Sequence, residues 1–260
     1  MKISAALEPA SQLAMACQIA FLPTLRAVLQ NPLLLLRPRE IGRIFFTHVW
    51  AQMGPGSDEN TRDIKQGLIT ANASGVVVDI GAGFGHTALH LDRTKVTKYV
   101  ALEPNERMHA EIRRLAASAG FAEEDGTLLI LPYGAGDTAL ITSALGGERT
   151  AGTLVAVLSL CSVPEPERAL AGLVRDVLRP GGTFVFYEHV LSPREDVGWW
   201  QKAWTPIWSA AFDGCCLDRP THVWVAAMDT WAEASVWGKP DDPEENLWWH
   251  RIGRFVKKAD

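Results

Sequence analysis

The residues of this chain best suited to bind a ligand are three glycines that follow a short apolar run. Val76-Val77-Val78 leads into Asp79-Ile80, and Gly81, Gly83 and Gly85 come next at alternate positions. Glycine adopts positive φ and lets the backbone approach a ligand closely, because it has no Cβ. Free N–H groups at the start of a following helix attract a polar or anionic group. The pattern predicts a buried strand, a tight ligand-binding turn and a helix start.

A carboxylate follows at the end of a second predicted strand. Tyr99-Val100-Ala101-Leu102 leads into Glu103, about 20 residues after the glycines, where a carboxylate can accept hydrogen bonds from ribose hydroxyls. Enzymes that bind dinucleotides and enzymes that bind S-adenosylmethionine (SAM) share this arrangement. The order Asp-x-Gly-x-Gly-x-Gly differs from the Gly-x-Gly-x-x-Gly of dinucleotide sites. We therefore favour SAM as the ligand, with NAD as the alternative.

Length and composition indicate a globular protein of 260 residues, 47% hydrophobic and 21% charged. A net charge of −5 and the lack of a Lys/Arg-rich block argue against a nucleic-acid partner. The cysteines show no metal-binding spacing and no disulfide framework, so we expect no metal and a reducing, cytoplasmic location. Most of the ten tryptophans fall in residues 199–249, which indicates an apolar acceptor pocket or lid, or alternatively a Trp-rich core.

Apolar periodicity predicts helices before the glycine turn and an α/β core after it. The early helices are expected at 8–30, 39–53 and 58–71. The core alternates strands and helices, which implies a parallel sheet with right-handed crossovers. We divide the chain into an N-terminal helical extension, 1–72, and a core domain, 73–260. The expected strands are 75–80, 98–103, 127–132, 153–159, 183–190, 233–237 and 250–257, and the expected core helices are near 85–92, 105–119, 137–145, 164–178, 196–211 and 219–231.

The first 36 residues are apolar, but Pro23, Arg26 and Pro32 interrupt them. No uninterrupted apolar run approaches the 18–20 residues, roughly, that a membrane-spanning helix needs. Three interpretations remain open: a lid over the cofactor, a segment in a membrane interface, or a span.

Ligands bind beyond the carboxyl ends of the strands in an open α/β sheet, and that rule selects the candidate site residues. His189, at the end of the fifth predicted strand, is the candidate catalytic residue. Alternatives are that Asp137 only caps a helix, that Cys161 is a small buried apolar side chain, and that His189 is a structural hydrogen bonder. The candidate cofactor-binding residues are Asp79, Gly81, Ala82, Gly83, Gly85, Glu103, Pro104, Gly136, Asp137, Ser159 and Leu160. The candidate acceptor-binding residues are His48, Trp50, Cys161, Tyr187, Trp200, Trp204 and Cys215.

Four segments carry a family resemblance. Leu160-Cys161-Ser162-Val163, Leu178-Arg179-Pro180-Gly181-Gly182, Glu188-His189-Val190 and Asp213-Gly214-Cys215-Cys216-Leu217 occur in this order. Over residues 64–256 the chain resembles the methyltransferase-like thiol S-methyltransferases of animals and their fungal relatives, within the class I methyltransferases. The resemblance implies a Rossmann-like, seven-stranded fold, SAM as methyl donor with S-adenosylhomocysteine as product, and a small lipophilic thiol as acceptor.

The chain departs from this family in its N-terminal segment and at the start of the fourth strand, and alternatives to S-methylation are open. The membrane anchor with which the animal enzymes begin is broken up here, so peripheral membrane contact is one expectation. An acidic residue common at the start of the fourth strand is replaced near Gly152-Thr153. O-methylation of a phenol, enol or carboxylate, and SAM binding without transfer, remain the alternatives to S-methylation. His189 would take the proton of an acidic nucleophile or stabilise its anion.

Overall fold

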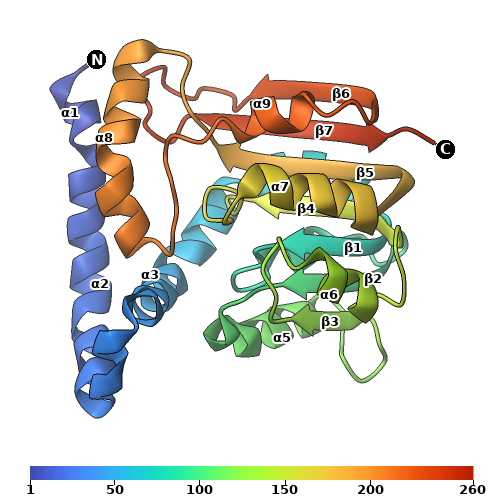
Figure 1. Cartoon of the computed structure of the whole chain (residues 1–260), viewed down its shortest axis with the longest axis horizontal. Helices are drawn as coiled ribbons and strands as arrows, with labels where there is room; N and C mark the ends of the chain where they lie inside the picture. The colour runs from blue at the N-terminus through green and yellow to red at the C-terminus, as the bar shows by residue number, and fades with distance from the viewer. Residues whose placement is uncertain (260) are drawn as a thin grey trace.

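The computed structural model describes residues 1–259, and its core is a seven-stranded sheet in the order β3-β2-β1-β4-β5-β7-β6. The strands β1 to β5 pair in parallel, whereas β7 is antiparallel to both β5 and β6. This confirms the predicted seven-stranded, mostly parallel Rossmann-like fold (Figure 1). The strands are β1 (Gly75–Ile80), β2 (Val96–Leu102), β3 (Leu128–Leu131), β4 (Ala151–Val157), β5 (Leu178–His189), β6 (Trp231–Gly238) and β7 (His250–Lys257).

Alternate side chains of the strands enter two apolar cores, one on each face of the sheet. Val78 of β1 and Phe184 of β5 belong to one core, and Val77 and Val185, their neighbours in sequence, belong to the other. Strands buried on both faces read as continuous apolar runs, which explains the sequence of β1. The first core is covered by α6 (Thr138–Ala144), α7 (Pro166–Gly172), η5 (Leu173–Val177) and α9 (Thr221–Ala226), and the second by η2 (Gln66–Thr70), η3 (His86–His90) and α5 (His109–Ser118).

Long helices before the sheet pack against a helix that follows it. Figure 1 shows α1 (Ile3–Ala6) and α2 (Glu8–Gln30) as a column beside α8 (Glu195–Ala211). The indole N–H of Trp204 on α8 donates to the carbonyl of Ala6 at 2.8 Å. A shared apolar cluster, called here the interhelix cluster, joins α2, α8 and α3 (Pro38–Asn60). Its buried members are Ala16, Ala20, Val49, Trp208, Phe212 and Leu217.

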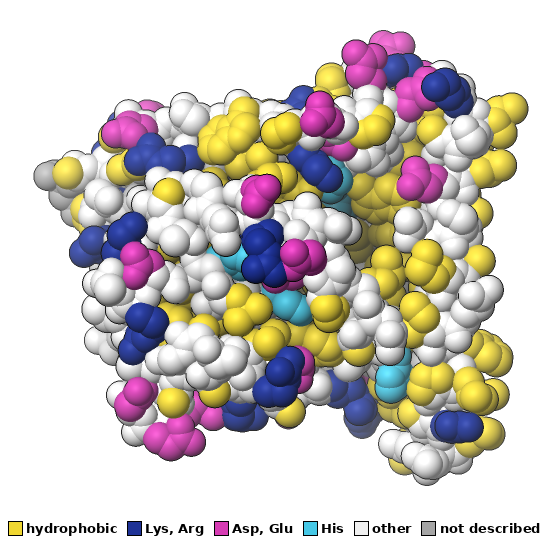
Figure 2. All heavy atoms as spheres, turned by 180° about the vertical axis from the view of Figure 1, so that it is seen from behind, with side chains coloured by type: hydrophobic (Ala, Val, Ile, Leu, Met, Phe, Trp, Pro, Cys, Tyr) yellow, Lys and Arg dark blue, Asp and Glu magenta, His cyan; other side chains and the backbone are white. Residues whose placement is uncertain are grey.

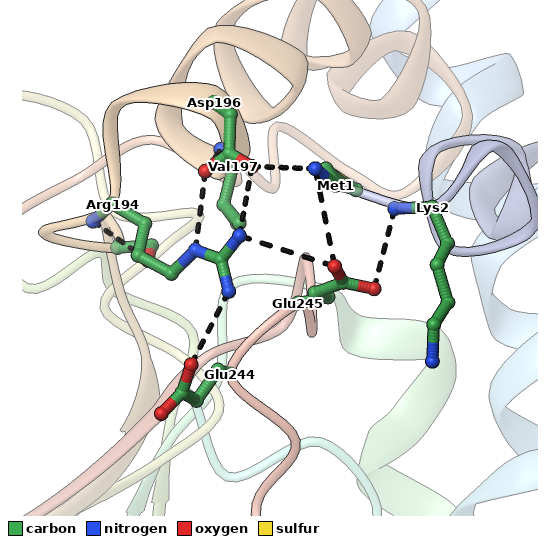
Figure 3. Close-up of polar contacts among 8 residues, drawn as sticks. Met1, Lys2, Arg194, Asp196, Val197, Glu244 and Glu245 are labelled. Carbon is green, nitrogen blue, oxygen red and sulfur yellow. Dashed lines mark hydrogen bonds and ion pairs between the residues drawn. The ribbon is translucent and has the colours of Figure 1, made fainter.

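Ion pairs hold the start of the chain against the start of α8 (Figure 3). The amino group of Met1 lies 2.7 Å from the carboxylate of Asp196, which also accepts from the Arg194 guanidinium at 2.8 Å. The backbone N–H of Lys2 donates to Glu245 at 3.3 Å. Exposed ion pairs contribute at most about 1 kcal/mol each, so the network orients the column while apolar packing stabilises it.

The structure differs from the expected helices in two places. One helix, α3, runs to Asn60 where a break near residue 54 was expected, and only α4 (Arg62–Lys65) and η2 follow before β1. Gly54 is buried there, and a Cβ would lie 3.1 Å from the His86 ring and 3.3 Å from the Trp50 ring, so close tertiary packing overrides the helix-breaking residues. The helix expected at 219–231 ends at Ala226, because Trp231 joins the sheet and packs against Phe255.

Gly253 on β7 gives a test of the sheet packing. A Cβ at this position would lie 2.3 Å from the Phe186 ring, which is buried in the core. Overpacking of this kind costs about 1–3 kcal/mol, so Gly253→Ala should lower the free energy of unfolding by that amount. The control Gly56→Ala lies on exposed α3 with nothing within 4 Å, and should keep or raise stability. Equal urea midpoints for the two variants would contradict the packing.

Candidate functional site

The turn after β1 has the conformation that its glycines were expected to provide. Gly81, Gly83 and Gly85 have φ of +65°, +56° and +83°. A Cβ on Gly81 would lie 2.8 Å from the Ser159 side chain, and one on Gly83 would lie 3.0 Å from the indole nitrogen of Trp50. Ser159 and Trp50 pack too closely to leave room for a Cβ, so this turn, called here the cradle, requires glycine at both positions. The helical segment that follows, η3, is a single short 3-10 turn, so a dipole effect contributes little.

Glu103 faces this turn from the end of β2. One of its oxygens accepts the N–H of Gly83 and the other accepts the N–H of Asn105, both at 2.8 Å. Burial raises the pKa of Glu103 to about 7. Each carboxylate oxygen has two acceptor positions, so Glu103 can still accept two ribose O–H bonds. The cradle and this carboxylate together fit the adenosine and methionine parts of SAM.

Helix α3 lies over the same turn. The Asn105 side chain donates to the hydroxyl of Thr47 on α3 at 3.0 Å. Trp50, one turn further along, contacts Gly83 and stacks on Phe46 with ring centroids 5.8 Å apart. The structure therefore places Trp50 against the glycine turn. His48 lies half-buried on the same helix.

Other predicted cofactor residues have partners of their own. Asp79 is buried, accepts the hydroxyl of Tyr99 at 2.8 Å, and has a pKa raised to about 6 by burial. Asp137 accepts the N–H of Gly134 at 2.8 Å and makes no cap bond to α6, while Gly136 beside it is exposed. Asp79 thus links β1 to β2, and Asp137 closes the turn after β3. Ala82 and Pro104 lie in the segments that follow β1 and β2.

A second buried carboxylate holds the turn after β4. One oxygen of Glu188, on β5, accepts the N–H groups of Ser159 and Leu160 at 2.8 and 3.1 Å. Glu188 is 0% exposed, and burial raises its pKa to about 7. The carbonyls of Leu160 and Val163 accept from the guanidinium of Arg219 at 3.0 and 2.6 Å. These bonds fix the turn that carries Cys161.

The structure brings Cys161, His189 and Cys215 together, a set called here the cysteine–histidine cluster. Their ligand atoms all lie within 4.8 Å of one another, and Nε2 of His189 is 3.2 Å from Sγ of Cys215. Cys161 and His189 are buried and Cys215 is partly exposed. Burial lowers the pKa of His189, whereas the neighbouring Cys161 raises it. The net shift is upward. A hydrogen bond with Cys215 and burial both favour the neutral thiol of Cys161 and raise its pKa.

Sequence spacing alone did not indicate this cluster, because its members are far apart in the chain. The parallel pairing of β4 and β5 brings Cys161 and His189 to neighbouring strand ends. Cys215 arrives from the segment after α8, where Gly214 has a φ of +85° and the N–H of Cys216 donates to the Cys161 carbonyl at 3.0 Å. The signal available in the sequence was that three of the family-like segments each contribute one member.

The remaining predicted acceptor residues lie in three different places, away from His48 and Trp50 on α3. Cys215 and Trp204 both pack on the interhelix cluster, so this apolar cluster adjoins the cysteine–histidine cluster. Tyr187 is buried and stacks on His250 with centroids 5.1 Å apart. Trp200 packs edge-on against the exposed Trp199. Figure 2 shows a hollow between the column of N-terminal helices and the sheet, lined by hydrophobic side chains with histidine among them.

A separate groove of about 560 Å³ lies between α3, α5 and the segment after the glycine turn. Phe84, His86 and Glu111 are among its lining residues. It contains neither Glu103 nor any member of the cysteine–histidine cluster. We therefore do not assign this groove to the site.

Comparison with known proteins identifies the family of this chain. A family model described as a methyltransferase domain matches residues 57–234, more than half of the chain. Human thiol S-methyltransferase TMT1B is 46% identical over 69 residues, which are 26% of this chain and only 28% of that protein. Mouse thiol S-methyltransferase TMT1B is 28% identical over 213 residues, covering 78% of this chain and 84% of that protein.

Solved structures share the fold at low sequence identity. An O-methyltransferase family protein from Burkholderia thailandensis has a TM-score of 0.56 and 11% identity, over 85% of this chain and 60% of that one. A protein from Nostoc punctiforme has a TM-score of 0.57 and 13% identity, over 82% of this chain and 60% of that one. At this identity the likeness concerns the fold alone.

Glu103 provides the most direct test of the cofactor site. Glu103→Ala removes the acceptor of any ribose hydrogen bond, and bonds to a charged group contribute about 1.5–3 kcal/mol. The variant should bind SAM roughly 10- to 100-fold more weakly in titration calorimetry. Glu106→Ala, an exposed carboxylate three residues away, is the matched control and should bind normally. Unchanged affinity in folded Glu103→Ala protein would refute the ribose assignment.

Proposed function

The chain belongs to the methyltransferase domain family, and we propose that it is a SAM-dependent methyltransferase whose acceptor is a small, lipophilic thiol. The proposal rests on the contact between a polar cluster and an apolar cluster. The polar cysteine–histidine cluster lies at the ends of β4 and β5, and Cys215 packs directly on the apolar interhelix cluster. An acceptor with one polar reacting atom and an apolar body matches such a site.

The similarity to thiol S-methyltransferases supports a thiol as the reacting group. It is strongest over a short stretch that spans 28% of the human relative, and it extends at lower identity over 84% of the mouse relative. The activity of those proteins therefore motivates the proposal for this chain.

The proposed reaction requires few catalytic groups. SAM supplies a methyl group that is already activated, so the chain has to align the acceptor and promote loss of its proton. A thiol has an unperturbed pKa of about 8.5 and reacts as the thiolate. The acceptor sulfur forms a bond to the methyl carbon as the sulfonium bond breaks, and the thiol proton leaves to His189 or to solvent. Cys161 is buried and its thiol pKa is raised, so it is better suited to line the site than to act as a nucleophile.

The acceptor class is tested by incubating the protein with SAM and matched thiols, phenols and carboxylic acids of similar size. Mass spectrometry should show methylated product from apolar thiols well above the phenols and acids. His189→Ala should lower kcat by about 10²–10⁴ if the residue handles the proton, with SAM affinity nearly unchanged. Cys216→Ser is the control, since Cys216 neighbours the cluster without belonging to it. If a phenol or acid is methylated in preference to the thiols, O-methylation replaces S-methylation as the function. If the protein binds SAM but forms no methylated product, methyl transfer itself is contradicted.

We also propose that the N-terminal column contacts a membrane surface peripherally, with the core in the cytoplasm. The helical segment Ile3–Gln30 is long and apolar enough to cross a membrane by length and composition, although its sequence is interrupted, and most of it is exposed. Exposed leucines continue through η1 (Pro32–Leu36), where Leu33 and Leu36 are 68% and 80% exposed. A large exposed apolar patch of this kind marks an interaction surface. The cover over the glycine turn comes from α3, so α2 and η1 are available for contact.

Polar substitution of the exposed leucines tests this contact. The triple variant Leu29→Gln, Leu33→Gln, Leu36→Gln should lose most binding to phospholipid vesicles in a sedimentation assay, because about 1.5–3 kcal/mol of apolar burial is lost per side chain. SAM affinity should stay at the wild-type value. Leu140→Gln, an exposed leucine on α6, should leave vesicle binding unchanged. Equal vesicle binding by the triple variant and wild type would contradict the contact.

A further inference from the structure

We propose that Cys161, His189 and Cys215 bind a zinc ion through two thiolates and one imidazole. Thiolate sulfur and imidazole nitrogen are the ligands that zinc prefers in proteins. Three protein ligands and one open position are the arrangement of catalytic zinc sites, including a two-cysteine, one-histidine type. Within residues 1–259, this is the cluster of metal-ligating side chains whose ligand atoms converge.

The distances suit such an ion. Zinc–sulfur and zinc–nitrogen bonds are about 2.3 and 2.0–2.1 Å, so ligand atoms on a tetrahedral ion lie roughly 3.5–3.8 Å apart. The ligand atoms of the cluster lie within 4.8 Å of one another, and the His189 Nε2 to Cys215 Sγ distance is 3.2 Å. Small side-chain movements are enough to reach tetrahedral geometry, with no change in the strands.

The backbone that carries the ligands is held before any ion binds. Glu188 and Arg219 fix the turn of Cys161, and the N–H of Cys216 donates to the Cys161 carbonyl. His189 is the last residue of β5 and pairs with His250 of β7. A preorganised set of ligands loses little conformational entropy on binding, which favours the ion.

The imidazole has unused capacity for a ligand. His189 is 5% exposed, and its Nδ1 has no hydrogen-bond partner in the part of the chain that the structure describes. Its Nε2 lies 3.2 Å from the Cys215 sulfur, and Cys161 is its other side-chain hydrogen-bond partner. Thiols are weak hydrogen-bonding groups, so a buried imidazole that faces only thiols is poorly satisfied. A zinc ion held between the two sulfurs and Nε2 would give this nitrogen a strong bond.

The open fourth position indicates a role, and this step rests on the thiol acceptor proposed above. An acceptor thiol that binds zinc gives its proton to solvent and becomes a thiolate at neutral pH. The thiolate sulfur then forms the bond to the methyl carbon while the sulfonium carbon–sulfur bond breaks. The neutral thioether product is a weaker zinc ligand and leaves. In this account His189 is a zinc ligand, and proton loss is driven by the ion.

Metal content tests the ion independently of activity. The full-length protein is purified without a histidine tag and with a phosphine reductant. Inductively coupled plasma mass spectrometry should then find about one zinc per chain. Cys161→Ser and Cys215→Ser should retain at least about tenfold less zinc, whereas Cys216→Ser should match wild type. Circular dichroism verifies folding, and Cys215, on a partly exposed segment, remains informative if the buried Cys161 variant fails to fold.

Cobalt reports the ligands and the open position. Cobalt(II) added to chelator-treated protein should give the strong sulfur-to-metal charge-transfer absorption of a tetrahedral thiolate site, absent in Cys215→Ser. A small apolar monothiol should intensify that absorption, while the corresponding alcohol should not.

The outcomes separate this inference from the proposed function. Metal-free protein that methylates thiols at the full rate, or a Cys161–Cys215 disulfide found in place of bound metal, would overturn the zinc site and leave the function intact. A bound metal with a thiol-insensitive cobalt spectrum would overturn the role of the fourth position. A zinc site in a protein that methylates only phenols would leave the metal and remove the thiol acceptor.

Discussion

Two buried carboxylates organise the ligand edge of this sheet. Glu103 holds the backbone of the glycine turn and Glu188 holds the turn after β4, each by accepting two backbone N–H groups. Burial raises the pKa of both to about 7, so each carboxylate is kept at an electrostatic cost. Such a cost is tolerated where backbone position matters to function. Glu103, at the end of β2, and Glu188, near the end of β5, therefore determine where the cradle and the cysteine–histidine cluster lie.

The segments that complete the site come from outside the sheet. Helix α3 covers the glycine turn through Trp50 and Thr47, and the segment after α8 delivers Cys215. Both are joined by the interhelix cluster, which also includes residues of α2. The helix over the glycine turn, the segment that carries Cys215 and the exposed column thus share one apolar core. A membrane contact of the column would bring a lipophilic acceptor close to the hollow seen in Figure 2.

The inner strands of the sheet could be predicted because runs such as β1 and β4 are largely apolar, with most residues buried. The cradle at Gly81 and Gly83 and the carboxylate of Glu103 follow from local pattern, and the structure has them side by side. Predictions failed where packing over distance decides: α3 runs through Gly54, and Trp231 joins the sheet. The predicted aromatic residues lie in separate places because tryptophan packs in a core between helices as readily as it lines a pocket. Trp204 packs in such a core.

The cluster of Cys161, His189 and Cys215 could not be read from spacing, since a strand pairing and a loop turn unite residues more than 20 positions apart. The family-like segments contain all three residues but do not indicate that they meet. Their chemistry depends on that meeting, because a lone buried cysteine is an apolar side chain, whereas two with an imidazole are a ligand set.

The central claim is that the ends of β4 and β5 present this cluster to the transferred methyl group. A crystal structure with S-adenosylhomocysteine bound tests it most directly. The account predicts ribose hydroxyls hydrogen-bonded to Glu103 and the product sulfur facing the cluster, with the acceptor position between them. A ribose away from Glu103, or a sulfur separated from the cluster by protein, would contradict it.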